Sequence, residues 1–333
     1  MVGVVLVIEM RNHSQHPPAS SRKDKEWGAL QTEASNPDSE NLDTLTTEEV
    51  VSLLLEEDRR GLEIAHRNRT DIARAASWVA EALDAGASVV FAGAGTSGRL
   101  GILEAAECPP TFGTDPQQIR AVIAGGPEAV FAAREGAEDN AEDGARVAAD
   151  LGTDDVLVAI SASSVTPFAL GALESARQRG ARTILVTCAP RDGISAVADL
   201  VLALDTGPEV LTGSTRLKAG SATKAVLNAI TTAAMVRLGK VYGNLMVDLR
   251  PGSAKLRDRA LRIIETAGDV SREEAERLHR AADSEVKTAI VMALCRLGAE
   301  PSRERLRVAG GHVRRAVAAG SGVEDGRSSS SNK

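Results

Sequence analysis

Short apolar runs recur along the middle of the chain, and a segment with helical periodicity separates each from the next. The five runs cover residues 88–92, 119–123, 156–160, 183–188 and 200–204. Parallel strands need crossover connections, and helices then cover both of their faces. The alternation therefore predicts a parallel α/β sheet with helices on both sides.

Helical patterns also lie before and after these runs. Thr46, followed three residues later by Glu49, predicts a capping box and a helix to about residue 60. Apolar positions at helical spacing predict a second helix over 71–83, and an alanine-rich stretch predicts a long one over about 216–238, either buried or facing a dimer partner. Further helices are expected over 255–267, after Ser271, and around 285–297 and 303–318.

These patterns divide the chain into five parts. We expect a disordered leader over 1–29, a helical segment over 30–66, a ligand-binding α/β domain over 67–240, a small helical region over 241–319 and a disordered tail over 320–333. The apolar start at Val2–Ile8 is too short to span a bilayer and lacks a preceding basic region, which argues against a signal peptide.

Composition and charge narrow the classes of function. Only 2% of the residues are aromatic and the net charge is −7, so a nucleic-acid surface with stacking side chains and a basic face is not expected. The three cysteines, Cys108, Cys188 and Cys295, are widely spaced, which predicts neither disulfides nor a zinc knuckle. We expect a protein of the reducing cytoplasm with no metal, no cofactor and no membrane partner.

A glycine and hydroxyl loop follows the first apolar run. Residues 93–99 read Gly-Ala-Gly-Thr-Ser-Gly-Arg and lead into a helix that is expected to begin near Leu100. Glycines allow close backbone approach, and the free N–H groups of a helix start favour an anion. The loop also fits G-x-G-x-x-G, but a dinucleotide fold needs an acidic residue after the next strand, where Cys108–Gly113 is no strand. A phosphomonoester fits better.

A second loop of similar chemistry follows the third apolar run. Ser161-Ala-Ser-Ser-Val-Thr-Pro167 again places hydroxyl side chains between a strand and a helix. Two such loops at the ends of neighbouring strands are expected to grip one phosphate.

The amino-acid sequence of these segments resembles that of the N-acetylmuramic acid 6-phosphate etherases, a family of the sugar isomerase (SIS) superfamily. The resembling strings include TEASNPDSENLDTLTTEEV, GAGTSGRLGILEAAECPPTFGTDP, IAGGPEAVFAAREGAEDN, TGPEVLTGSTRLKAGSATK and LGKVYGNLMVDLR. The resemblance covers roughly residues 30–262 and continues more loosely to Met292. It implies a SIS-type α/β/α sandwich with a five-stranded parallel sheet, usually dimeric, plus the small C-terminal helical subdomain.

The resemblance also implies an activity. Such enzymes split the D-lactyl ether of N-acetylmuramate 6-phosphate into N-acetylglucosamine 6-phosphate and D-lactate in cell-wall recycling. Glu107 matches the family's proton donor, and Glu138 matches its second catalytic glutamate. We expect partial burial of Glu107 against Cys108-Pro109-Pro110, which would help it to hold a proton. The alternative to a catalytic role is that both carboxylates lie on a solvated helix face, as most glutamates do.

Several other residues are candidates for the site. The expected substrate-binding residues are Gly95, Thr96, Ser97, Gly98, Arg99, Ser161, Ser163, Thr166 and Lys218. Arg99 either faces the phosphate or pairs with Glu104 or Glu107, and both readings stay open. Ser221–Lys224 spells S-x-x-K, but no S-D-N or K-T-G accompanies it, so Lys224 is read as structural or solvated.

The chain departs from the family in the second loop. Etherases usually carry Gly-Arg where this chain has Ser164-Val165, and Asn where it has Ala189 and Ser253. A lost glycine is expected to alter the loop's backbone, and a lost arginine removes a charge. Two alternatives remain open: a non-catalytic sugar-phosphate sensor, which needs neither glutamate, and an aldose-ketose isomerase of the same superfamily.

Overall fold

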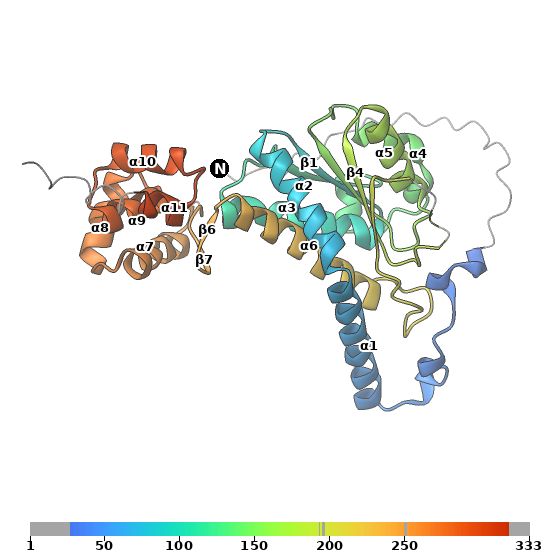
Figure 1. Cartoon of the computed structure of the whole chain (residues 1–333). Coiled ribbons are helices and arrows are strands. Elements are labelled where there is room, and N and C mark those ends of the chain that lie inside the picture. Colours follow the sequence, from blue (N-terminus) through green and yellow to red (C-terminus); the bar gives the residue numbers. More distant parts are fainter. Residues whose placement is uncertain (1–26, 193, 195–196, 250–251, 320–333) are drawn as a thin grey trace, which may run out of the picture. The chain divides into compact units, whose positions relative to one another are not determined.

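The computed structural model describes residues 27–192, 194, 197–249 and 252–319 (Figure 1). The predicted tail and most of the predicted leader lie outside this part of the chain. The structure divides into two compact units. The first takes the chain up to Ala106 together with Asp115–Ala233, and the second takes Glu107–Thr114 and the chain from Ala234 onward.

The first unit is built on the predicted parallel sheet. Its strands are β1 (Val89–Gly93), β2 (Ile119–Ile123), β3 (Val156–Ile160), β4 (Arg182–Thr187) and β5 (Leu200–Ala203). They lie in the order β2-β1-β3-β4-β5, and every neighbouring pair is parallel. The prediction of five buried parallel strands is therefore confirmed.

Helices cover both faces of this sheet. Helices α4 (Ala141–Val147) and α5 (Pro167–Gln178) lie on one face of the sheet (Figure 1). Their side chains share one hydrophobic cluster with those of β1, β3 and β4. These two helices pack closely at two glycines. A Cβ on Gly144 of α4 would lie 1.9 Å from a carbonyl oxygen of α5, and a Cβ on Gly171 of α5 would lie 2.1 Å from a carbonyl oxygen of α4. Helix α2 (Arg69–Asp84) and helix α3 (Gly95–Phe112) belong to the other layer, where Gly101 of α3 lies against Phe91.

The N-terminal part of the first unit holds four short 3₁₀ turns and the helix α1. The turns are η1 (Trp27–Ala29), η2 (Gln31–Glu33), η3 (Pro37–Ser39) and η4 (Leu42–Thr44). Helix α1 (Thr47–Arg67) begins with the predicted capping box, in which Glu49 N donates to Thr46 Oγ1 and Thr46 N donates to Glu49. It runs past the predicted end at residue 60. Gly61 lies where α1 approaches α6.

The helix α6 (Lys218–Arg237) is the predicted long alanine-rich helix. It is joined to α3 by Glu104, which accepts a hydrogen bond from Thr231 Oγ1. The helix α3 itself continues through Pro109 and Pro110 to Phe112, so Glu107 lies inside a helix and not at its end.

The second unit contains a short hairpin and five helices. The hairpin pairs β6 (Val241–Tyr242) with β7 (Leu245–Met246) and was not predicted, since two residues a strand leave no periodicity to detect. The helices are α7 (Ala254–Gly268), α8 (Arg272–Ala281), α9 (Val286–Cys295), α10 (Ala299–Val308) and α11 (Val313–Ala318). The expected single helix over 303–318 was wrong, because Gly310 and Gly311 both take positive φ and separate α10 from α11.

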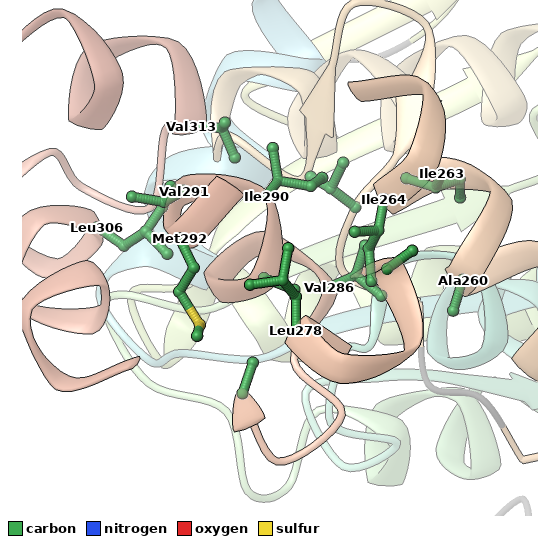
Figure 2. Close-up of a cluster of buried hydrophobic side chains, with 14 of the residues drawn as sticks. Ala260, Ile263, Ile264, Leu278, Val286, Ile290, Val291, Met292, Leu306 and Val313 are labelled. Atoms are coloured by element: carbon green, nitrogen blue, oxygen red, sulfur yellow. The ribbon is translucent and has the colours of Figure 1, made fainter. Parts of the chain in front are cut away.

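An aliphatic core holds the second unit together. Figure 2 shows Ile264 of α7, Leu278 of α8 and Ile290 of α9 converging, and each is at least 97% buried. At the hairpin, the Asp248 carboxylate accepts hydrogen bonds from Lys240 Nζ at 3.1 Å and Lys287 Nζ at 2.8 Å. No aromatic side chain is among the described buried residues of this core.

Two histidines of this unit predict a loss of stability in acid. Burial lowers the pKa of His279, whose Nε2 has no hydrogen-bond partner among the described residues, and burial together with Arg315 and Lys287 lowers the pKa of His312. The unfolded chain therefore binds protons more readily than the folded one below the ordinary value of 6.5. The stability contribution is present above that pH and falls as the pH drops towards the folded-state values.

We expect urea unfolding followed by circular dichroism to show a free energy of unfolding that falls between pH 7 and pH 5, with a smaller slope in His279→Gln. The exposed His66 of α1 provides the control, and His66→Gln should keep the original slope. A slope that is identical in all three proteins would contradict the assignment to His279.

Candidate functional site

Three strands of the sheet end at the same level. Gly93 at the end of β1 lies opposite both Ile123 at the end of β2 and Ile160 at the end of β3. The loops that follow these strands therefore start side by side. In open parallel sheets, ligands bind beyond the carboxyl ends of the strands, so this edge is the candidate site.

The loop after β1 opens directly into α3. Gly95 takes a φ of +52°, and the helix begins there, so the N–H groups of its first turn have no partner within the helix. Thr96 and Ser97 lie in this turn and are partly exposed. The turn offers backbone and hydroxyl donors together with the positive end of the helix dipole.

Gly98 allows α3 to start so close to the sheet. A Cβ at this position would lie 2.6 Å from the Gly93 carbonyl oxygen and 2.6 Å from Ile123 Cγ1. Only glycine fits there without displacing the backbone. Gly98 is thus explained by the packing of α3 on the sheet, and the predicted close approach of the glycines to a ligand stays a prediction.

Arg99 is engaged with backbone groups. Its Nε donates to the Val130 carbonyl at 2.8 Å and its Nη2 donates to the Ala129 carbonyl at 2.8 Å. It thereby ties α3 to the turn η5 (Pro127–Val130) that follows β2. Neither proposed carboxylate partner of Arg99 is bonded to it in these contacts, and its predicted contact with phosphate stays a prediction.

The second hydroxyl loop is held by β4. Ser161 N donates to the Val186 carbonyl at 3.0 Å, and Cys188 N donates to the Ala162 carbonyl at 3.0 Å. Ser161 Oγ and Thr166 Oγ1 lie 2.9 Å apart and hydrogen-bond to each other, whereas Ser163 is partly exposed at the turn. Thr166 precedes α5 but makes no side-chain cap to it, so the N–H groups that follow Pro167 at this helix start are not bonded by that side chain.

Ser164 takes the conformation that a glycine would favour. Its φ is +63°, and its N–H donates to the Ser161 carbonyl at 3.2 Å. The expected effect of the lost glycine on the loop's backbone stays a prediction. Ser164 adopts a left-handed conformation and accepts the strain of a Cβ there.

The two predicted catalytic glutamates are both exposed. Glu138 lies in η6 (Ala137–Asp139), and a Cβ on Gly125, just after β2, would lie 3.1 Å from Ala137 Cβ, so η6 borders the same sheet edge. Glu107 lies on α3, three turns after Ser97, and is exposed as well, in contrast to the expected partial burial. Neither glutamate has a desolvated setting within the described chain.

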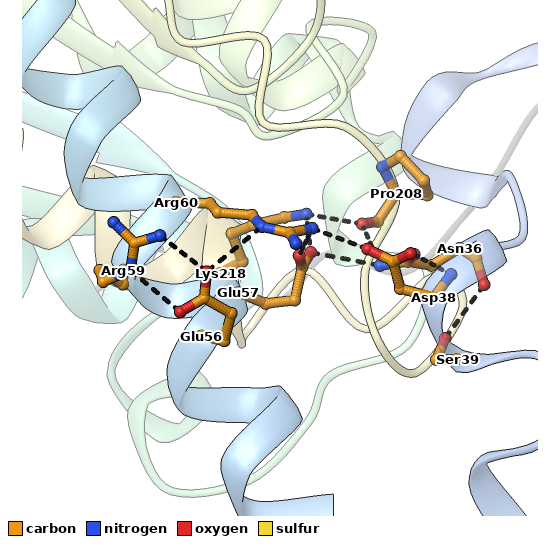
Figure 3. Close-up of polar contacts among 9 residues, drawn as sticks. All are labelled: Asn36, Asp38, Ser39, Glu56, Glu57, Arg59, Arg60, Pro208 and Lys218. Carbon is orange, nitrogen blue, oxygen red and sulfur yellow. Dashed lines mark hydrogen bonds and ion pairs between the residues drawn. The ribbon is translucent and has the colours of Figure 1, made fainter.

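Lys218 is buried in an ion pair. Its Nζ bonds the Glu57 carboxylate and also donates to the Pro208 carbonyl at 2.8 Å, as Figure 3 shows. Lys224 lies near Asn228, as expected of a structural or solvated lysine. Burial raises the pKa of the Cys188 thiol to about 11, which keeps it protonated, and Cys108 is buried too.

Three polar residues of this region were missed from the sequence. Asn36, Glu57 and Glu209 are all nearly fully buried around the start of α6. They come from three distant parts of the chain, and a buried Glu is rare enough that no local pattern marks it. The only available signal was that Asn36 and Glu209 fall within the family-like strings.

Comparisons with known proteins agree with this architecture. Residues 71–177 match the model of the glucokinase regulatory protein N-terminal SIS domain, and residues 136–233 match that of the SIS domain. An N-acetylmuramic acid 6-phosphate etherase of Rubrobacter xylanophilus is 49% identical over 89% of this chain and 99% of its own. Those of Crocosphaera subtropica and Geobacillus thermodenitrificans are 46% and 47% identical, over 89% and 86% of this chain and 98% of each relative.

The chain belongs to the N-acetylmuramic acid 6-phosphate etherase family. One of its departures has a simple physical account. Ser253, at a position where etherases usually carry Asn, is the N-cap of α7, and its Oγ accepts from Leu256 N at 3.2 Å. Ser and Asn cap helices about equally well, so this exchange is conservative.

No helix in the described part of the chain is long and apolar enough to cross a membrane. No group of three or more His, Cys, Asp or Glu side chains is arranged there to hold a metal ion.

The strain at Ser164 leads to a prediction for this etherase-family chain. A left-handed conformation costs a residue with a Cβ about 1–2 kcal/mol. Glycine avoids this cost but loses more conformational entropy on folding, which offsets part of the gain in stability. Ser164→Gly should therefore raise the free energy of unfolding by about 0.5–1 kcal/mol in thermal or urea melts. Ser163→Gly is the control, since Ser163 has no positive φ, and it should lower stability or leave it unchanged. A loss of stability in Ser164→Gly would contradict the strain.

Proposed function

We propose that this protein is a lyase that cleaves the D-lactyl ether of N-acetylmuramate 6-phosphate to give N-acetylglucosamine 6-phosphate and D-lactate. The observation that carries the proposal is the match to curated etherases across nearly their whole length, such as 49% identity over 99% of the Rubrobacter relative. Both family glutamates stand at the matching positions, as Glu107 and Glu138.

The sheet edge supports binding of a sugar phosphate. Two helix starts, those of α3 and α5, lie after the aligned strands β1 and β3, and each follows a hydroxyl loop. We assign the phosphate to the predicted set Gly95, Thr96, Ser97, Gly98, Ser161, Ser163 and Thr166. Arg99 remains in the set as a prediction, although it already bonds two backbone carbonyls. The predicted contact of Lys218 with the phosphate is not kept, because its ammonium group is buried against Glu57 and the Pro208 carbonyl.

The chemistry needs an acid and a base. In the open-chain sugar, the aldehyde at C1 acidifies the proton on C2, so that a carboxylate can remove it while a carboxylic acid protonates the lactyl oxygen that leaves C3. Water then adds at C3. We assign these proton transfers to Glu107 and Glu138, without deciding which residue serves which atom. The reaction as written uses acid–base steps alone.

We propose that the enzyme works as a homodimer in cytoplasmic recycling of peptidoglycan. An exposed apolar face of α1 is the argument for a dimer. Val51, Leu55 and Leu62 share that face at spacings of four and seven residues, and they are 49%, 65% and 50% exposed. A second copy of the chain would cover them, and the mass of the protein in solution tests this directly.

The sensor alternative has a specific observation behind it. Part of the chain matches the SIS domain of a regulatory protein over 71–177. A sensor would bind the sugar phosphate and release nothing. We favour the enzyme because etherases match a far larger share of the chain, 89% in the Rubrobacter relative.

Release of D-lactate tests the proposal. With N-acetylmuramate 6-phosphate we expect enzymatic release, measured with D-lactate dehydrogenase, and unphosphorylated N-acetylmuramate should be a very poor substrate because the donors of both loops would lack their anion. Equal turnover of the two sugars would contradict the phosphate site. Binding of the phosphorylated sugar without lactate would favour the sensor.

Replacement of the glutamates tests the chemistry. Glu107→Gln and Glu138→Gln keep shape and hydrogen bonding but cannot transfer the proton, so each should reduce lactate release by about 10² to 10⁴. Exchange of solvent deuterium into C2 of N-acetylglucosamine 6-phosphate shows which variant keeps its C2 base. Glu135→Gln, an exposed neighbour of Glu138, is the matched control and should be fully active. Unchanged rates in both catalytic variants would refute the mechanism.

A further inference from the structure

Four polar side chains are buried together at the start of α6. Asn36, Glu57, Glu209 and Lys218 are only 4%, 2%, 1% and 5% exposed. They belong to the N-terminal segment, to α1, to the loop before α6 and to α6 itself. Burying charged groups is costly unless each is paired and hydrogen-bonded, so their arrangement needs an explanation.

Glu209 caps the first turn of α6. Its carboxylate accepts from Lys218 N at 3.0 Å and from Ala219 N at 2.8 Å. These are N–H groups that a helix start leaves without an internal partner and that would otherwise attract an anion. An internal carboxylate already occupies them, so the start of α6 is not itself available to a phosphate. Burial also raises the pKa of Glu209.

Glu57 fixes the side chain of Lys218. Its carboxylate bonds Lys218 Nζ and accepts from Asn36 Nδ2 at 3.2 Å, and Asn36 also donates to the Pro208 carbonyl at 3.3 Å (Figure 3). Gly61, one turn later on α1, lets the two helices meet, since a Cβ there would lie 3.0 Å from Lys218 Cγ. Lys218 is thus held at both its backbone and its ammonium group.

The turn that these contacts hold lies against the first hydroxyl loop. A Cβ on Gly220 would lie 3.8 Å from Thr96 Cγ2. The Ala219 carbonyl is 3.6 Å from Cys188 Sγ, directly after β4. A shift of the first turn of α6 would therefore be felt at Thr96 and at the strand that supports the second loop.

We propose that Glu57 and Glu209 are positioning residues that hold the first turn of α6 against the Thr96 loop and so keep the anion site in its binding shape. Lys218 serves this purpose through Glu57 and is not a ligand of the phosphate. The identity of the sugar ligand rests on the proposed function, but the role of these residues concerns affinity for the phosphate group itself.

A double-mutant cycle tests the role of Lys218. Glu57→Leu leaves the buried Lys218 ammonium group without its carboxylate, and Lys218→Met leaves Glu57 with the half-exposed Arg60 as its remaining cation. The double variant removes the buried pair at similar volume. Affinity for inorganic phosphate and for N-acetylglucosamine 6-phosphate is measured by calorimetry. We expect each single variant to lose about tenfold or more, and the double variant to return to within about threefold of the unmutated protein.

The outcomes separate the two roles of Lys218. A double variant as weak as Lys218→Met would make the lysine a direct ligand and overturn the proposal, as would unchanged affinity in the single variants. If the single variants fail to fold, a folded double variant decides the question alone. Because inorganic phosphate is the probe, the result holds whether or not the protein releases lactate.

Glu209→Gln provides a second test that does not involve Lys218's charge. The amide keeps one acceptor for two N–H groups, so the KM for the phosphorylated sugar should rise about tenfold with kcat within about threefold, since the proton-transferring groups lie elsewhere. Asp58→Asn is the matched control. Asp58 also joins α1 to the first turn, through Ser221 Oγ at 2.9 Å, but touches no backbone amide, and its variant should keep KM within about twofold. A fall in kcat with unchanged KM, or equal effects in both variants, would overturn the assignment.

Discussion

The close approach of α3 to the ends of β1 and β2 is the constraint on which the candidate site depends. Gly98 has no room for a side chain between the Gly93 carbonyl and Ile123, and the helix can start at the sheet edge only because of this. The aligned ends of β1, β2 and β3 then bring the hydroxyl loops and η6 to the same edge. The core of the sheet is mostly aliphatic, with Phe91 and Phe168 as fully buried aromatic members, so the polar groups of the candidate site come from the loops and helix starts at the sheet edge.

The polar network under α6 solves a different problem. A buried helix start carries N–H groups that need partners, and Glu209 supplies them from within the chain. That carboxylate and Glu57 bring two negative charges into the interior, and the cations of Lys218 and Arg60 and the hydrogen bond from Asn36 balance them. The network joins segments that are far apart in the sequence, and it links the N-terminal helix to the site.

The sequence predicted the sheet and most helices because hydrophobic periodicity reports burial directly. It predicted the turn after β1 because glycines and hydroxyls leave a local signature, but the helix expected from about Leu100 begins already at Gly95, so that most of the predicted loop is the first turn of α3. It failed at the β6–β7 hairpin and at the break at Gly310–Gly311, where the deciding property is the φ of single residues. Glu57 and Lys218, 161 residues apart, could not be paired from the chain alone. Likewise, the engagement of Arg99 with carbonyls of η5 depends on tertiary contacts.

The left-handed conformation at Ser164 shows where the shape of the second loop comes from. Hydrogen bonds between the loop and β4 and within the turn hold the backbone in a conformation that a residue with a Cβ does not favour. The path of this loop is thus set by its backbone bonds and not by the residue type at position 164. Side chains of different size and charge can therefore stand at positions 164 and 165 on the same backbone frame.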